Sequence, residues 1–376
     1  MGAVAAGEVL DLFLQLVRVP SPPGGEREVD DLCAGYLREL GLEVIEDDAA
    51  GSLGGSAGNL YCRLPGTPGT SGTPLFFCAH TDTVPHDAPI TPVVRDGTVT
   101  NAEDGILGAD NKATVAALLD ALRQIVQGEI PHAGIELVLT AQEEVGLRGA
   151  KAFDHDTLQA SLGYVFDHAS PIGGMVLEAP SQYSIDARFI GREAHSGIAA
   201  EEGRSAIAAA ARAIAEMRLG RIDDETTANI GLIRGGSARN IVAGQCTISA
   251  EARSLDHAKA LRQCQAMIDA ITHAADAEGC EVETTTTHEY EAYRLRRAEP
   301  VVALAEQALT ASGYVPEALR TGGGADSHIF NARGRPCLNL PNGMRDIHTP
   351  SEAISVTDIE GVVRIVLALV EGARAR

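Results

Sequence analysis

Five short clusters of histidine and carboxylate side chains stand where a predicted strand ends or the backbone turns. They contain, in chain order, His80, Asp82, Asp110, Glu143, Glu144, Asp167 and His348. Parallel strands of an α/β sheet deliver the residues at their carboxyl ends to one edge, where such sheets bind their ligands. Mixed imidazole and carboxylate ligands suit Zn²⁺, and also Mn²⁺ or Co²⁺. The clusters therefore supply His, Asp, Glu, Asp and His for a metal site at this edge, with one glutamate to spare.

Each cluster, taken singly, also has an ordinary structural explanation. A histidine at a strand end can simply be hydrogen-bonded in the core, and Asp110, between a glycine turn and a helix, is a favoured helix N-cap. Asp82, two residues beyond His80, would project on the same side and accept the second ring N–H of a metal-binding histidine. Glu143 and Glu144 could form an exposed acidic loop, but adjacent carboxylates after a buried strand repel each other and are expected to need a cation.

The sequence lacks the motifs of several competing chemistries. It contains no HExxH, no GxxxxGK[ST] and no GxGxxG. A GxSxG match at residues 54–58 lies in a glycine-rich loop before a strand, whereas a nucleophile elbow lies between a strand and a helix. A shared carboxylate between two metals about 3.5–4 Å apart is instead the known arrangement of one class of hydrolases.

The elements that must position these residues change character along the chain. Buried strands are predicted at 59–64, 75–79, 135–140 and 163–166, with a helix at 112–127. Their alternation is typical of a mostly parallel sheet with helices on both faces. From residue 182 to 287 the predicted order becomes β-α-β-β-α-β, the ferredoxin-like arrangement. We therefore expect an α/β domain formed by residues 1–180 and 292–376, interrupted by a smaller α+β domain at 181–291.

Charge and cysteine content restrict the partners and the compartment. The formal net charge is −22, from 30 basic and 52 acidic residues, which argues against nucleic acid and anionic membranes as partners. No stretch approaches the roughly 20 apolar residues of a membrane helix. The first 20 residues are interpreted as an amphipathic helix and not as a signal peptide. Seven cysteines without a CxxC pair indicate reduced thiols and a cytoplasmic protein.

In their order and spacing, the clusters resemble the metal motifs of the M20 metallopeptidases, and the resemblance runs from about residue 10 to the C-terminus. It rests on His80-Thr81-Asp82, Gly108-Ala109-Asp110-Asn111-Lys112-Ala113, Glu143-Glu144, Asp167 and Ile347-His348-Thr349. The stretches 178–182 and 322–326 are most similar to the peptidase T-like branch. Asn111 departs from the family, which often has a second Asp there.

The resemblance implies a fold and a ligand set. The fold would be a zinc-exopeptidase-like α/β catalytic domain with an inserted ferredoxin-like lid and dimerisation domain. His80 and Asp167 would hold one divalent metal ion, Glu144 and His348 the other, and Asp110 would bridge them. Zinc is the expected metal, with Mn or Co as alternatives.

The resemblance also assigns roles in catalysis and substrate binding. Glu143 would be the general base, Asp82 would orient His80, and His195 of the lid would stabilise the oxyanion. Asn240 and Arg253 would contact the carboxylate or carbonyl of the substrate, and the backbone of Gly322, Gly323 and Gly324 would lie along it.

These assignments predict a two-metal hydrolase that cleaves small peptides, in the manner of a tripeptide aminopeptidase. One alternative is an amidohydrolase that removes an acyl or carbamoyl group from an amino acid. A non-catalytic binding protein of the same fold is a second alternative, which the intact base and ligands argue against. A homodimer formed through the inserted domain is a further expectation.

Overall fold

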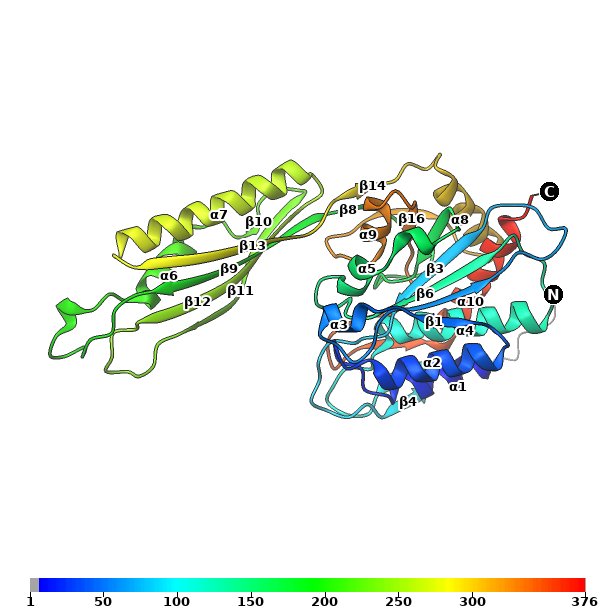
Figure 1. Cartoon of the computed structure of the whole chain (residues 1–376), viewed down its shortest axis with the longest axis horizontal. Coiled ribbons are helices and arrows are strands. Elements are labelled where there is room, and N and C mark those ends of the chain that lie inside the picture. The colour runs from blue at the N-terminus through cyan, green and yellow to red at the C-terminus, as the bar shows by residue number, and fades with distance from the viewer. Residues whose placement is uncertain (1–6, 376) are drawn as a thin grey trace. The chain divides into compact units, whose positions relative to one another are not determined.

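The computed structural model describes residues 7–375, and the chain divides into two compact units (Figure 1). The larger unit contains the chain up to Leu177, Arg294–Arg320, and the chain from Ala325 onward. The smaller unit contains Glu178–Tyr293 and also Thr321–Gly324. Its bounds lie close to the expected insertion at 181–291, but the glycine-rich turn at Thr321–Gly324 joins it as well.

The larger unit combines helices with two sheets. Its helices are α1 (Glu8–Val17), α2 (Arg27–Glu39), α3 (Ala49–Leu53), α4 (Ala109–Gln127), α5 (Arg148–Ala152), η1 (His155–Thr157), α8 (Pro300–Ala311), α9 (Ser327–Ala332) and α10 (Val356–Gly372). Its main sheet contains β1 (Val44–Glu46), β2 (Leu60–Leu64), β3 (Leu75–His80), β6 (Ile135–Thr140), β7 (Leu162–Val165), β8 (Gly174–Ala179), β14 (Tyr293–Arg294), β15 (Glu317–Arg320) and β16 (Cys337–Asn339). A second, small sheet contains β4 (Pro92–Arg95), β5 (Thr98–Asn101) and β17 (Ala353–Ser355).

The main sheet is mixed, which corrects the expectation of a mostly parallel sheet. Its order is β1-β2-β6-β3-β7-β16-β8-β14, with β15 beside β8. The central strands β6, β3, β7 and β16 are parallel, whereas β1, β2 and β8 pair antiparallel at the two sides. The strands β3, β6 and β7 are buried on both faces along their whole length, as parallel strands are, although β6 contains the buried acid Glu136. The outer strand β1 is short and mostly exposed, whereas β2 and β8 are mostly buried, so the apolar pattern of these two strands does not reveal their antiparallel direction.

Alternation along β3 distributes its side chains between the two faces of this sheet. Phe76 and Cys78 point to one face, where they pack with Phe153 and with Phe330 of α9. Phe77 points to the other face and lies beside α4 and α10. Helices therefore cover both faces of the centre, as predicted, and the carboxyl ends of β3, β6 and β7 remain available for the site.

The smaller unit has the β-α-β-β-α-β order expected from the sequence, with one added strand. Its elements are β9 (Ser181–Ile190), η2 (Ala200–Glu202), α6 (Ala206–Glu216), β10 (Gly220–Arg221), β11 (Thr226–Gly235), β12 (Gln245–Ser254), α7 (His257–Ala277) and β13 (Glu281–Tyr290). The addition is the two-residue strand β10 between α6 and β11. The sheet order is β10-β11-β12-β9-β13, and all neighbours pair antiparallel.

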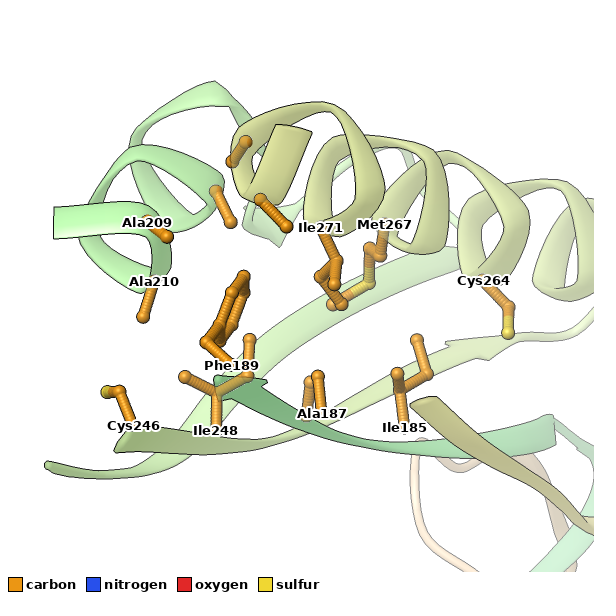
Figure 2. Close-up of a cluster of buried hydrophobic side chains, with 14 of the residues drawn as sticks. Ile185, Ala187, Phe189, Ala209, Ala210, Cys246, Ile248, Cys264, Met267 and Ile271 are labelled. Carbon is orange, nitrogen blue, oxygen red and sulfur yellow. The ribbon is translucent and has the colours of Figure 1, made fainter. Parts of the chain in front are cut away.

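One face of this small sheet carries the core of the unit (Figure 2). Ile185, Ala187 and Phe189 alternate on β9 and point toward the helices, which place Met267 and Ile271 of α7 against them. Alanines on α6, including Ala209 and Ala210, allow that helix to lie close to the same face. The inserted unit therefore has a hydrophobic core of its own.

Three further findings concern the cysteines, membrane-spanning helices and the first helix. All seven cysteines are buried and unpaired. Among the described residues, no helix is both long and apolar enough to cross a membrane. The first helix begins at Glu8, and residues 1–6 of the expected N-terminal helix lie outside the described part of the chain.

Candidate metal centre

Three neighbouring strand ends in the larger unit carry most of the predicted site residues. His80, the last residue of β3, is in register with Thr140, the last residue of β6, and β7 pairs with the other side of β3. The chain then turns into Asp82 after β3, Glu143 after β6 and Asp167 after β7. Parallel pairing thus brings together side chains that are far apart in the sequence.

Asp110 lies between the two predicted histidine ligands. Its Oδ1 is 3.2 Å from Nε2 of His80, and its Oδ2 is 3.2 Å from Nε2 of His348. The residue stands at the start of α4, but its φ of −80° and ψ of 106° are not helical, and Gly108 takes the N-cap position. The bridging interpretation of Asp110 therefore fits this geometry better than the N-cap interpretation.

Glu144 and Asp167 complete the ring of predicted ligands. Oε1 of Glu144 is 3.0 Å from Nε2 of His348, and Oδ1 of Asp167 is 4.0 Å from Nε2 of His80. Oε2 of Glu143 is also close, at 3.9 Å from Nε2 of His80. Two overlapping groups have all their ligand atoms within 4.8 Å of one another, namely His80-Asp110-Glu144 and His80-Glu143-Asp167.

Asp82 supports the site in two ways. Nδ1 of His80 lies 2.9 Å from the backbone carbonyl of Asp82 and 3.4 Å from its carboxylate. The carboxylate accepts hydrogen bonds from the backbone N–H groups of Glu143, at 2.9 Å, and Glu144, at 3.1 Å. The sequence predicted only the contact with His80. The bonds to the two glutamates fix the turn that carries both of their carboxylates.

Two non-glycine residues of the site have a positive φ. Gln142, directly before Glu143, has a φ of +54°, and His348 has a φ of +64°. Non-glycine residues seldom adopt this left-handed region, and such conformations concentrate at functional sites.

Two buried carboxylates near the site were not assigned roles from the sequence. Glu352 accepts three backbone hydrogen bonds, from Leu107, Gly108 and Asp110, at 2.8, 2.9 and 3.0 Å. Asp326 accepts a hydrogen bond from the Thr140 hydroxyl at 2.5 Å. Asp326 is the last residue of the stretch 322–326, whose similarity to the peptidase T-like branch could have identified it. Glu352 stands in a loop without any pattern, so its role depends on the fold alone.

Two acidic side chains of the site, Glu143 and Asp167, are shifted toward their neutral forms. Burial raises the pKa of Glu143 well above its usual value, although His80 opposes the shift. Burial and the nearby charge of Asp110 likewise raise the pKa of Asp167. Buried carboxylates this close together need positive charge or hydrogen-bond donors to stabilise their ionised form.

The two histidines are shifted toward their protonated, charged forms. Hydrogen bonds to Asp110 and Glu144 raise the pKa of His348 to about 10. Burial by itself would lower the pKa of His80, but the charge of Glu143 and the bond to Asp110 outweigh it. Even when both histidines are protonated, they cannot balance four ionised carboxylates. Divalent cations would supply the difference, and the imidazole and carboxylate donors suit Zn²⁺, Mn²⁺ or Co²⁺.

The remaining predicted residues lie in the smaller unit and form two separate groups. The loops of His195 and Asn240 are adjacent, because the Ser196 N–H donates to the Asn240 carbonyl at 3.0 Å. Arg253 lies near the end of β12 and donates to the Gly322 carbonyl at 3.0 Å. Gly324 packs against Tyr290, since a Cβ placed there would lie 2.6 Å from the Tyr290 hydroxyl.

Glu352→Ala is expected to weaken metal binding about 10–100-fold, the usual effect of losing a residue that supports a metal ligand. The carboxylate holds the turn that presents Asp110, and Ala leaves three buried N–H groups without their acceptor. Competition with a chromophoric chelator measures the affinity, with Glu371→Ala on exposed surface as the control. An unchanged affinity would show that the turn holds Asp110 without Glu352.

A ring of histidines and carboxylates at the edge of an α/β sheet places the chain among the metal-dependent hydrolases. The model of Peptidase family M20/M25/M40 matches residues 76–372. The uncharacterized protein YqjE of Bacillus subtilis (strain 168) is 38% identical over 365 residues, which cover 97% of this chain and 98% of YqjE.

Two solved structures are similar over almost their whole length. Aminopeptidase PepT from Bacillus cereus ATCC 10987 has a TM-score of 0.85 and 37% identity, covering 99% of this chain and 100% of that one. A tripeptidase from Staphylococcus aureus subsp. aureus Mu50 has a TM-score of 0.90 and 36% identity, covering 98% and 99%. The chain belongs to peptidase family M20/M25/M40, and it is a metal-dependent peptide hydrolase.

Proposed function

We propose that the protein is a cytoplasmic tripeptide aminopeptidase that uses two zinc ions. The observation that carries the two-metal proposal is the position of Asp110, whose two oxygens each face a different histidine. The similarity to a tripeptidase and to an aminopeptidase over the whole chain supports the substrate class. Seven unpaired cysteines fit a reducing compartment.

The chain's own residues supply positioning and proton transfer. When bound, the two ions would polarise the scissile carbonyl and acidify water. His80 and Asp167 would hold one ion, Glu144 and His348 the other, with Asp110 between them. Glu143 accepts the proton of the attacking water and delivers it to the leaving amine.

A substrate panel tests the substrate class. Tripeptides with a free α-amine are expected to be hydrolysed with a higher kcat/KM than dipeptides, N-acetyl tripeptides, N-acyl amino acids or N-carbamoyl amino acids. Preferred hydrolysis of the N-acyl or N-carbamoyl amino acids would instead identify an amidohydrolase, the alternative with the same metal centre. Parallel assays with Zn²⁺, Mn²⁺ and Co²⁺ at equal occupancy test the choice of metal.

Substrate recognition is assigned to the inserted unit, but its two groups of residues are far apart. Arg253 pairs with Gln182 at the end of the sheet where the chain enters and leaves the unit. His195 and Asn240 lie beyond the opposite end, where Gln245 pairs with Ile190. Gln245 and Arg253 are eight residues apart along the strand, a span of about 26 Å, whereas an extended tripeptide spans about 10 Å.

We therefore propose a homodimer in which Arg253 and His195 reach one substrate from different copies. The inserted unit offers a surface for this, because β10 pairs only with the first part of β11. Beyond that pairing, β11 is an edge strand with Leu232 and Ile233 about half exposed, at 53% and 51%. Exposed apolar edge strands are sites of pairing with a second chain. Analytical ultracentrifugation at micromolar concentration is expected to give a dimer.

His195→Ala is expected to lower kcat about 10²-fold with little change in KM, since its proposed partner is an oxyanion that exists only near the transition state. A mixing experiment tests which copy supplies it. When the His195→Ala chain is mixed with a Glu143→Gln chain, a hybrid dimer has one site with both groups intact. Recovery of activity on mixing is the expected result. A change confined to KM, or no recovery from a proven hybrid dimer, would contradict the assignment.

A further inference from the structure

We infer that Glu251 determines how strongly the protein prefers peptides with a free C-terminal carboxylate, because it competes for Arg253. This inference rests on the proposed function, in which Arg253 binds that carboxylate. It concerns a residue in the inserted unit that lies outside the metal centre and to which no role has yet been assigned.

The guanidinium of Arg253 is already paired with a carboxylate. Its Nε donates to Oε1 of Glu251 at 3.1 Å, and its Nη2 donates to Oε2 at 2.8 Å. This parallel pair of bonds is the geometry with which arginine recognises a carboxylate, and it occupies one whole edge of the guanidinium. A substrate carboxylate that approaches the same edge therefore meets a protein carboxylate in its place.

The remaining edge of Arg253 is engaged as well. Nη1 donates to the Gly322 carbonyl at 3.0 Å and to the Tyr290 hydroxyl at 3.4 Å. The Tyr290 hydroxyl in turn donates to Gln182, at 2.5 Å. These bonds orient Arg253 beside the glycine-rich turn. The edge that faces Glu251 is therefore the one at which a substrate carboxylate can replace the Glu251 carboxylate.

The exchange is feasible because the pair is accessible. The side chains of Arg253 and Glu251 are 25% and 33% exposed. Partly exposed ion pairs of this kind are weak, so a substrate carboxylate can displace Glu251 at modest cost. A C-terminal amide carries no charge and gains nothing from the exchange. The charge of Glu251 therefore lowers the affinity for peptides with a free C-terminal carboxylate, but not the affinity for C-terminal amides. It narrows the difference in affinity between these two kinds of peptide.

The test is the Glu251→Gln variant, assayed with one tripeptide as the free acid and as the C-terminal amide. The amide side chain keeps the shape but lacks the charge, so KM for the free acid is expected to fall about three- to fivefold. The KM of the peptide amide and both kcat values are expected to stay within about twofold of wild type. An unchanged or higher KM for the free acid would overturn the inference.

Two reference variants make the result specific. Glu283 pairs with Arg188 at 3.3 Å on neighbouring strands of the same sheet, so Glu283→Gln removes the same charge from a similar pair elsewhere. An equal fall of KM in this variant would show that the effect is one of general charge, and it would overturn the inference.

Arg253→Lys tests the role of Arg253 separately from the role of Glu251, because Lys cannot make the paired bonds of the guanidinium to a carboxylate. If Arg253→Lys raises KM for the acid alone while Glu251→Gln changes nothing, only the role of Glu251 fails. If Arg253→Lys affects acid and amide alike, the proposed role of Arg253 fails.

Discussion

Glu143→Gln should reduce kcat by about 10²–10⁴-fold while the protein keeps its fold and its metal, because the amide cannot accept a proton from water. Glu143 suits this role because it is buried beside His80 and its backbone N–H is fixed by Asp82. Hydrolysis of a free-amine tripeptide measures kcat, and elemental analysis of the same sample measures the bound metal.

The neighbouring glutamate provides the matched control. Glu143 and Glu144 both lie within reach of His80 and other ligand atoms, so distance alone does not separate the base from the ligand. Glu144→Gln should lose metal together with activity, whereas Glu143→Gln should lose activity alone. If Glu143→Gln lost its metal while Glu144→Gln kept its full metal content, Glu143 would be the metal ligand and Glu144 the general base.

Asp110→Ala should have the other large effect, a loss of at least about 10³-fold in kcat/KM together with most of the bound metal. Asp110 is the residue that faces both His80 and His348, so its removal weakens both proposed positions at once. Elemental analysis after gel filtration gives the ratio of metal to protein, and circular dichroism checks the fold. Retention of two metal ions per chain would show that Asp110 does not bridge them.

Much of the site was predictable because its ligands follow strong local patterns. The run 75–79 is apolar throughout, as a central parallel strand is, and it leads directly into His80. The strand before Glu143 is also buried throughout, but it contains the acid Glu136, so its pattern is less uniform. The inserted unit was predictable for a similar reason, since strict alternation along β9 reports one buried face.

The parts that could not be predicted depend on contacts between distant segments. The antiparallel strand β1 is a three-residue edge element whose own pattern is weak. The strand predicted at 59–64 corresponds to β2, but its antiparallel direction follows only from its pairing with β1 and β6. Glu352 looks like a loop residue in the sequence, and only the fold brings it to the backbone of Asp110. Asp110 itself looked like a helix cap, because a residue before a helix gives the same local pattern whichever way its carboxylate points.

The separation of Arg253 from His195 shows the same limit. Both residues were assigned to one substrate by position in the sequence, which carries no information on distance. The strand register places them at opposite ends of the inserted sheet. A second copy of the chain then becomes part of the proposed mechanism, and Glu251 becomes a competitor at the Arg253 end.

Metal titration of the stripped protein tests the central claim most directly. Chelator-treated protein is titrated with Zn²⁺ while tripeptide hydrolysis and bound zinc are measured on the same samples. The two-metal account predicts no hydrolysis without metal and a rate that reaches its plateau at two zinc ions per chain. Full hydrolysis by metal-free protein, or a plateau at one ion per chain with no second ion bound, would contradict it.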